Sequence, residues 1–151
     1  MIWKSVLAIL VIGFLAGAYF VRTKPLDTAS LHIDPETAER PGVPGHVLLR
    51  AGGDIEPPVF EMDASALALR VEAVILSTPR TEKLAGELAD GYASYVTRSA
   101  LWGFPDIASV KVVEIEEGKS SLIVLSRLRY GQMDMGVNRA RVEDWLAQLS
   151  R

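Results

Sequence analysis

Hydrophobic and polar positions alternate along this chain in three distinct patterns. Residues 5–21 form one uncharged, largely apolar run. Residues 63–78 and the last part of the chain repeat apolar side chains every three or four positions, which is the period of an α-helix. Between them, residues 81–129 contain short apolar runs separated by turn residues, a pattern typical of β-strands. The patterns therefore predict an apolar helix, then a second helix, several strands and a final helix.

The amino-terminal run is long enough to cross a membrane. Its 17 residues make roughly 26 Å of helix, close to a hydrocarbon core of about 30 Å, and Lys4 and Trp3 suit the interface. The alternative is a cleaved signal peptide, with residues 6–15 as its apolar core and residues 16–18 as a small-x-small cleavage site. Apolar character continues to Val21, which favours a retained anchor over residues 1–22.

The segment from residue 23 to residue 60 holds six of the eight prolines. Proline fixes φ and removes a backbone donor, so an extended and irregular segment is expected. One short strand is predicted over residues 46–51. The segment is interpreted as a stalk that docks on a domain formed by residues 61–151.

The predicted domain begins with a helix capped by Asp63 and ended at Thr78 by the following Pro79. The last helix carries an apolar stripe and has Asp134 as its predicted cap; the stripe consists of Val142, Trp145, Leu146 and Leu149. Four strands in two hairpins lie between the helices, over residues 81–88, 92–99, 107–115 and 120–129. A run of strands bracketed by helices predicts a two-layer α+β domain with a mostly antiparallel, four-stranded meander.

Composition narrows the function classes. Three of the 16 basic residues lie at or before Lys24 and all 19 acidic residues follow it, so the remainder has a formal net charge of −6. Such an acidic domain does not suit nucleic acid. The absence of cysteine excludes disulfides, thiolate nucleophiles and iron–sulfur ligation. The two histidines, His32 and His46, lack metal-ligand spacing, and no phosphate-binding loop or nucleophile elbow appears, so no metal or cofactor is expected.

Three stretches suggest a family. "TPRTEKLAG" from Thr78, "YVTRSALWGFPD" from Tyr95 and "SRLRYGQMDMGVNRARVEDWL" from Ser126 resemble the domain-of-unknown-function 1499 family of bacterial and plastid proteins. The resemblance covers about residues 63–149 and brings no reaction. An amino-terminal anchor with a proline-rich segment also looks like many members, which implies a single-pass inner-membrane protein of a bacterium with an extracytoplasmic domain. Many relatives carry a cysteine before the first helix; "PGVPGHVLLRAGG" stands there in this chain, so a cysteine-dependent role is not transferable.

One edge of the predicted sheet gathers polar residues. In an antiparallel meander the start of the first strand, the end of the second, the start of the third and the end of the fourth lie together. The amino-terminal turn of the last helix begins at the same edge, where its free amides favour anions. The candidate binding residues are Arg80, Arg98, Trp102, Phe104, Asp106, Arg127, Arg129, Asp134, Asn138 and Arg139.

This edge has two interpretations. In the functional one, the arginines form a cationic cleft walled by Trp102 and Phe104. In the structural one, Arg98 or Arg127 pairs with Asp106 or Asp134 and the aromatic rings close the core, which is the commoner arrangement of such residues.

The favoured hypothesis is a membrane-anchored accessory module that binds an envelope protein or a small anionic ligand. One alternative is an envelope hydrolase that uses Asp106 or His46; an enzyme is less favoured than a binding module. Another is a purely structural interaction module. Strand alternation sets Ile123 and Leu125 opposite the helix layer, so this face needs a cover, either the stalk or a second copy in a homodimer.

Overall fold

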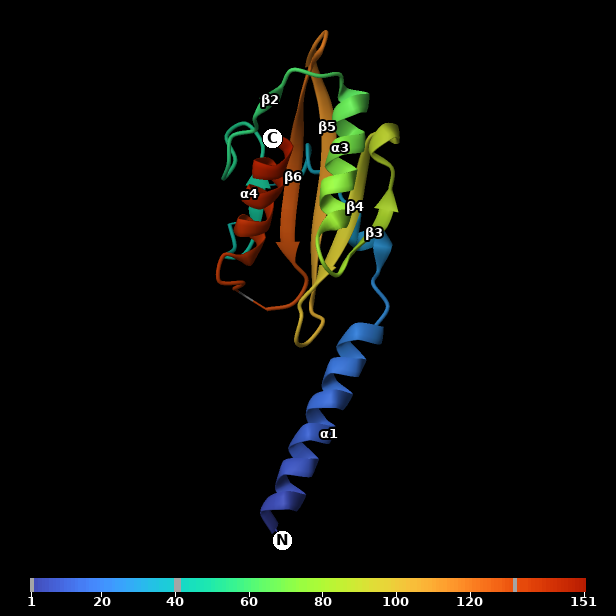
Figure 1. Ribbon diagram of the computed structural model, residues 1–151, viewed down its shortest axis with the longest axis vertical. Helices are drawn as coiled ribbons and strands as arrows, with labels where there is room; N and C mark the ends of the chain where they lie inside the picture. The colour runs from blue at the N-terminus through green and yellow to red at the C-terminus, as the bar shows by residue number, and fades with distance from the viewer. Residues whose placement is uncertain (1, 40–41, 132) are drawn as a thin grey trace.

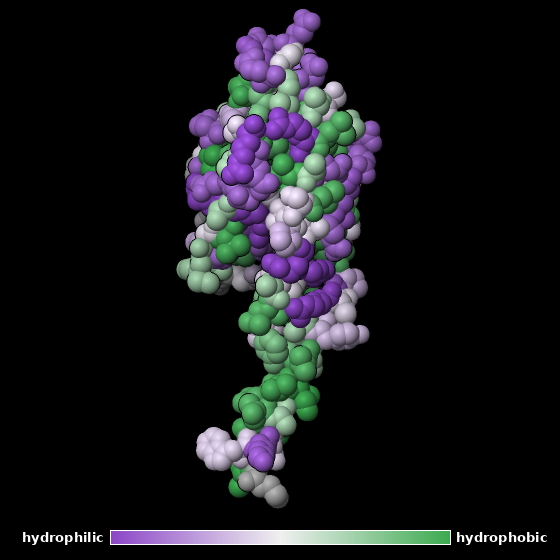
Figure 2. Space-filling model, in the orientation of Figure 1, coloured by the Kyte–Doolittle hydropathy of each residue, from purple (hydrophilic) through white to green (hydrophobic). Residues whose placement is uncertain are grey.

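In the computed structural model, residues 2–39, 42–131 and 133–151 are described, and they form a long helix that leads into a folded domain (Figure 1). Helix α1, Ile2–Thr23, contains no charged residue between Lys4 and Arg22 and is long enough to span a membrane. On the face shown, the helix is largely apolar above its first residues, whereas polar side chains are common on the domain (Figure 2). This confirms the predicted apolar helix. Its length and composition suit a membrane span, and a signal sequence at an amino terminus has the same properties.

The predicted meander is confirmed, with two further strands on its edge. The sheet has the order β1-β6-β5-β4-β3, and β2 also pairs with β6; every pairing between these strands is antiparallel. The strand bounds are β1 Val47–Leu49, β2 Val59–Phe60, β3 Thr81–Gly86, β4 Tyr92–Arg98, β5 Pro105–Glu116 and β6 Lys119–Leu128. The sheet therefore has six strands and not four.

The extra strands come from the proline-rich segment. Val47 lies opposite Ser126 and Phe60 lies opposite Ser120, so β1 and β2 share the outer edge of β6. An uncovered edge of this length would expose a row of unpaired amides and carbonyls. The two strands span only three and two residues, which is too short for an alternating pattern to identify β2 from the sequence.

Two helices cover one face of the sheet (Figure 1). Helix α3, Ala64–Ser77, buries Leu67, Val71 and Ile75, and α4, Val137–Leu149, buries Val142, Trp145 and Leu149. Their spacing of three, four or seven positions places each set on one side of its helix. The indole Nε1 of Trp145 donates to Thr78 Oγ1 at 2.8 Å, which joins the two helices. Asp63 stands at the cap position of α3 without a side-chain capping bond.

The opposite face is covered by residues 26–38, here called the back strap, which include the short helix α2, Thr28–Leu31. Leu31 packs with Val96 and Ile107. His32 lies 2.9 Å from Ser94 Oγ through its Nδ1 and stacks on the Tyr92 ring at a centroid distance of 4.2 Å. The same chain thus supplies a cover for the face opposite the helices.

Charged contacts fasten the back strap. Lys111 Nζ lies 3.1 Å from Asp34 Oδ2 and 2.7 Å from Glu36 Oε2. Hydrogen bonds to Glu36 and Asp34 raise the pKa of Lys111. Burial alone would raise the pKa of Asp34, but bonds from the Glu36 amide and Lys111 outweigh it and lower that pKa. Ile123 and Leu125, which were predicted to need a cover, are buried within the single chain.

Candidate functional site

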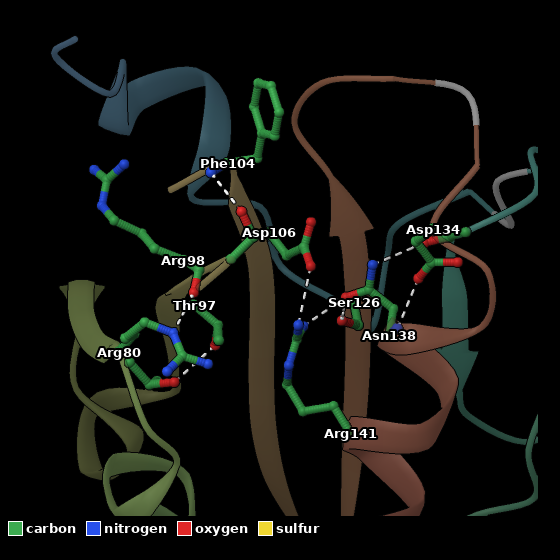
Figure 3. A network of polar contacts seen from close by, with 12 residues as sticks. Arg80, Thr97, Arg98, Phe104, Asp106, Ser126, Asp134, Asn138 and Arg141 are labelled. Atoms are coloured by element: carbon green, nitrogen blue, oxygen red, sulfur yellow. Dashed lines mark hydrogen bonds and ion pairs between the residues drawn. The ribbon is translucent and has the colours of Figure 1, made fainter. Parts of the chain in front are cut away.

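The predicted edge exists, and it lies at the end of the domain next to α1 (Figure 1). Arg80 precedes β3, Arg98 ends β4, Asp106 is the second residue of β5 and Arg127 stands near the end of β6. These side chains nevertheless point to different surroundings, and the close-up shows Asp106 directed at Arg141 while the Arg98 guanidinium points away from it (Figure 3). The candidates therefore form separate groups instead of one cleft.

The first group is a buried polar cluster between α4 and the sheet, here called the helix-side network. Asp106 Oδ2 accepts a hydrogen bond from Arg141 Nη2 at 2.9 Å, and Arg141 Nη1 donates to Asn138 Oδ1 at 2.7 Å (Figure 3). Asn138 is fully buried; its Oδ1 also accepts from Ser126 Oγ at 2.6 Å, and its Nδ2 donates to the Gly45 carbonyl at 3.0 Å. Every polar group of the Asn138 side chain thus has a protein partner.

The predicted pairing of Arg98 or Arg127 with Asp106 is wrong, because Arg141 occupies that role. Burial raises the pKa of Asp106, against the opposing effect of Arg141. Asn138 and Arg141 are three positions apart, so they share one side of α4 and lie in line with its buried stripe. Two polar residues in register with an apolar stripe were the signal that could have identified this network from the sequence.

Asp134 caps α4 from outside the helix. Its Oδ1 accepts from the Gly136 amide at 2.9 Å and its Oδ2 accepts from the Asn138 amide at 2.6 Å. Burial would raise the pKa of Asp134, but these amide bonds outweigh it and lower that pKa. The predicted capping role is confirmed, although Gly136 holds the cap position itself. The carboxylate therefore occupies the anion position at this helix terminus.

Arg127 belongs to the other face of the sheet. Successive residues of β6 alternate in direction, so Ser126 faces α4 and Arg127 faces the back strap. Arg127 Nη2 donates to the Leu31 carbonyl at 2.5 Å, and burial lowers the pKa of Arg127. Burial and the nearby Arg127 charge also lower the pKa of His46. Arg127 is thus held by the back strap, whereas Arg98 at the end of β4 donates to the Gly103 carbonyl.

The second group is an open hollow of about 330 Å³ beside the carboxyl end of α1, here called the arginine groove. It is lined by Arg22, Arg80, Thr81, Glu82, Arg98 and Ser99. Among the described residues, none of its three arginines forms an ion pair, and the described side-chain hydrogen bonds of all three go to backbone carbonyls. Arg80 Nε donates to the Arg98 carbonyl at 3.0 Å, and Arg98 Nη1 donates to the Gly103 carbonyl at 3.2 Å. Arg22 was not among the predicted site residues, because nothing local distinguishes it from an ordinary flanking charge.

The aromatic candidates do not wall the arginine groove. The Trp102 ring lies 4.5 Å from the Phe14 ring of α1 and 6.2 Å from the Phe104 ring, centroid to centroid. Phe104 continues this row to Tyr130 at 6.3 Å. The rings therefore lie at the junction between the domain and α1.

The last two candidates lie elsewhere on the surface. The Arg129 guanidinium sits 5.4 Å from the Tyr130 ring centroid. Arg139 pairs with Glu143 at 3.1 Å and donates to the Asp54 carbonyl at 3.2 Å. Neither residue lines the arginine groove.

A larger hollow of about 470 Å³ lies between α3 and the turn before β4, with Leu69, Leu88 and Val112 in its wall. Its neighbouring charges engage one another, since Lys83 Nζ lies 2.6 Å from Glu72 and 2.5 Å from Glu87. Within the part of the chain that the structure describes, no group of three or more histidine or acidic side chains is placed to hold a metal ion. Among the described residues, the three arginines of the arginine groove form no ion pair, although Glu82 also lines the hollow.

These features define an α+β domain with a six-stranded antiparallel sheet behind an amino-terminal apolar helix. The chain belongs to the family described as "Protein of unknown function (DUF1499)", which matches residues 29–149. This confirms the family resemblance and extends it toward the amino terminus. The match includes most of the back strap and both edge strands, so these belong to the family domain. No curated protein matches the chain.

Proposed function

We propose that this protein is a membrane-anchored module of the bacterial envelope, with an extracytoplasmic domain whose arginine groove binds an anionic phosphate group at the surface of the inner membrane. One observation carries the proposal. Arg22, Arg80 and Arg98 converge on one hollow, and no ion pair neutralises them among the described residues. The rest of the chain after Lys24 is acidic overall, so this local excess of positive charge is not a property of the whole surface.

The position of the groove favours a ligand at the membrane surface. Arg22 ends the uncharged run of α1, so in a retained span it lies at the level of the lipid headgroups. Phosphate is a favourable partner there because a guanidinium presents its N–H groups as a planar fork that matches two phosphate oxygens. Each guanidinium has five such donors. Arg80 and Arg98 each use one in a described bond, which leaves capacity for a ligand.

The same chemistry fits two sources of phosphate, a lipid headgroup or a free phosphate ester. The full chain in mild detergent can be titrated with phosphatidylglycerol or phosphatidylcholine and analysed by native mass spectrometry. We expect phosphatidylglycerol adducts that are retained through delipidating washes, with weaker retention of phosphatidylcholine. If glycerol phosphate displaces the lipid at comparable concentration, the free ester is the ligand and the lipid is not.

Variants make this test specific to the groove. Arg80→Ala and Arg98→Ala should each reduce lipid retention by about tenfold, the equivalent of one charge-assisted contact of about 1.4 kcal/mol. Arg129→Ala removes the same charge from the same end of the domain but from outside the groove, so it should retain the lipid. Equal loss in all three variants, or no loss in the two groove variants, would contradict the proposal.

A further inference from the structure

We infer that the loop of residues 99–104, here called the junction loop, inserts Trp102 and Leu101 into the membrane leaflet on the side of the domain. The bilayer then surrounds α1 and also contacts the domain directly. This inference rests on the part of the proposed function that retains α1 as a membrane anchor. It does not depend on phosphate binding in the arginine groove.

The junction loop packs along one side of α1. The Trp102 ring lies 4.5 Å from the Phe14 ring, and a Cβ placed on Gly17 would lie 3.3 Å from the Trp102 ring. Ala18 is only 3% exposed, whereas most of α1 has no contact with the domain. Phe14, Gly17 and Ala18 follow the helical spacing of three and four positions, so they form one stripe. The small residues in this stripe let the indole approach the helix closely.

The level of that contact along α1 places the indole in lipid. Phe14 precedes Arg22 by eight residues, which is about 12 Å along a helix. The uncharged run of α1 is only roughly 26 Å long, so it has no length to spare against a core of about 30 Å. Raising Phe14 to the membrane surface would leave residues 5–13 inside, a span of roughly 13 Å. The helix can cross the membrane only if Trp102 descends into the leaflet beside it.

Several peptide groups of the junction loop are already paired within the protein, which lowers the cost of placing them in a medium of low polarity. Arg22 Nη2 donates to the carbonyls of Leu101 at 2.9 Å and Ala100 at 3.2 Å. Within the loop, the Gly103 amide bonds the Ser99 carbonyl at 3.1 Å, and the Phe104 amide bonds Ser99 Oγ at 3.0 Å.

Gly103 allows this close arrangement. It adopts a φ of +78°, and a Cβ at this position would meet Arg22 Cγ at 2.5 Å. A larger residue would therefore displace the arginine that satisfies the loop carbonyls. The contact between α1 and the domain therefore depends on glycine at position 103 of the junction loop.

Apart from Ser99, the side chains that the junction loop exposes are apolar. Residues 99–105 contain no charged residue, and Leu101 is 64% exposed while Phe104 is 40% exposed. The Tyr130 ring adjoins the Phe104 ring, and Lys24 Nζ lies 5.7 Å from the centroid of the Tyr130 ring. Exposed aromatic rings with a lysine at one level are typical of a membrane interface. A bilayer surface therefore matches this end of the domain better than water does.

The natural absence of cysteine makes a site-specific test direct. Single variants Leu101→Cys, Leu10→Cys and Glu117→Cys of the full chain are spin-labelled and reconstituted in phosphatidylcholine vesicles. Collision of each label with oxygen, which concentrates in lipid, is compared with collision with a water-soluble nickel complex. Leu10 reports the middle of α1, and Glu117 reports the β5–β6 turn at the far end of the domain (Figure 1). The neutral lipid separates this test from phosphate selectivity in the groove.

We expect the Leu101 label to favour oxygen over nickel, as the Leu10 label does, and the Glu117 label to favour nickel. Adding Trp102→Ala to Leu101→Cys should shift the label toward nickel by severalfold. A Leu101 label that behaves like the Glu117 label while Leu10 reports lipid would overturn the inference and leave the anchor intact. If the Leu10 label also favours nickel, α1 is not in the bilayer and the anchor in the proposed function fails together with the inference.

Discussion

The helix-side network and the arginine groove lie at the same edge of the same sheet, yet their arginines have opposite surroundings (Figure 3). The side chain of Arg141 is 11% exposed and faces the Asp106 carboxylate. Arg80 and Arg98 face backbone carbonyls and a hollow open to solvent. An arginine at a sheet edge therefore does not define a site; the presence or absence of a carboxylate partner distinguishes a structural join from a binding surface.

The difference arises from what packs over each half of the edge. On the β5–β6 side, α4 brings Asn138 and Arg141 down onto Ser126 and Asp106, and the low polarity of that interior requires each polar group to be paired. On the β3–β4 side, the nearest additional element is α1, which contributes another cation, Arg22. Among the described residues that line the groove, Glu82 of β3 is the one acidic residue. The first half is thus neutralised and the second keeps a positive excess.

The largest expected effect is in the helix-side network. Asp106→Ala should lower the free energy of unfolding by about 2–3 kcal/mol, because it leaves the buried Arg141 with Asn138 as its remaining partner. The measurement is urea unfolding of the full chain in mild detergent, followed by tryptophan fluorescence. Asp106→Leu combined with Arg141→Met removes both charges and should recover part of the loss. A cost below about 0.5 kcal/mol for Asp106→Ala would mean that the pair does not hold α4 to the sheet.

An intermediate effect is expected at Asp134, and it depends on pH. Asp134→Asn should cost about 1 kcal/mol at neutral pH, because the side-chain amide nitrogen cannot accept one of the two amide bonds and the negative charge at the helix terminus is lost. The pKa of Asp134 is lowered in the folded protein, so its stabilisation is fully present above the unfolded value near 3.9 and is lost as the pH falls through the lowered folded value. The difference from the native chain should therefore narrow on acidification.

The control for Asp134 is on the same helix. Asp144→Asn changes an exposed residue of α4 and should stay within about 0.5 kcal/mol of the native chain at neutral pH. Unfolding curves for both variants and the native chain at several pH values test this. A gap for Asp134→Asn that widens toward acid would contradict the capping role.

The smallest effect on stability is expected in the arginine groove. Arg98→Ala should change the free energy of unfolding by less than about 0.5 kcal/mol, because the half-buried Arg98 forms no ion pair among the described residues and lines an open hollow. Arg80 has a φ of +60°, a conformation that glycine accepts without strain. Arg80→Gly should therefore be at least as stable as Arg80→Ala in the same urea experiment. A large loss of unfolding free energy in Arg98→Ala would show that Arg98 stabilises the fold, as Arg141 does, and would contradict a binding role for the groove.

Much of the fold could be predicted because its signals are local. Repeats of three and four apolar positions identified α3 and α4, and short apolar runs between turn residues identified β3 to β6. The uncharged run before Arg22 identified α1. Asp134 was recognised as a cap because its partners, the amides of Gly136 and Asn138, lie within four residues. Each of these patterns depends on neighbours that the sequence places side by side.

The partners of the candidate residues could not be predicted in the same way, because they are distant in the chain. Asp106 meets Arg141 across 35 positions, and Arg127 meets Leu31 across 96. Alternation along β6 could place Ser126 and Arg127 on opposite faces, but it could not tell that the back strap would cover one of them. The short strand predicted over residues 46–51 is present as β1, but its pairing with β6 and the whole of β2 were not predicted, because both depend on the edge of β6.

By itself, the sequence determined the order of the elements, the apolar amino-terminal helix, the acidic domain and the gathering of arginines at one sheet edge. These follow from side-chain periodicity, composition and antiparallel connectivity, which need no knowledge of packing. Only the tertiary structure decided which arginine is neutralised by a carboxylate, which is half-buried against the back strap and which joins Arg22 beside α1. Partners are chosen through space, and an arginine's surroundings depend on which distant segment packs against it.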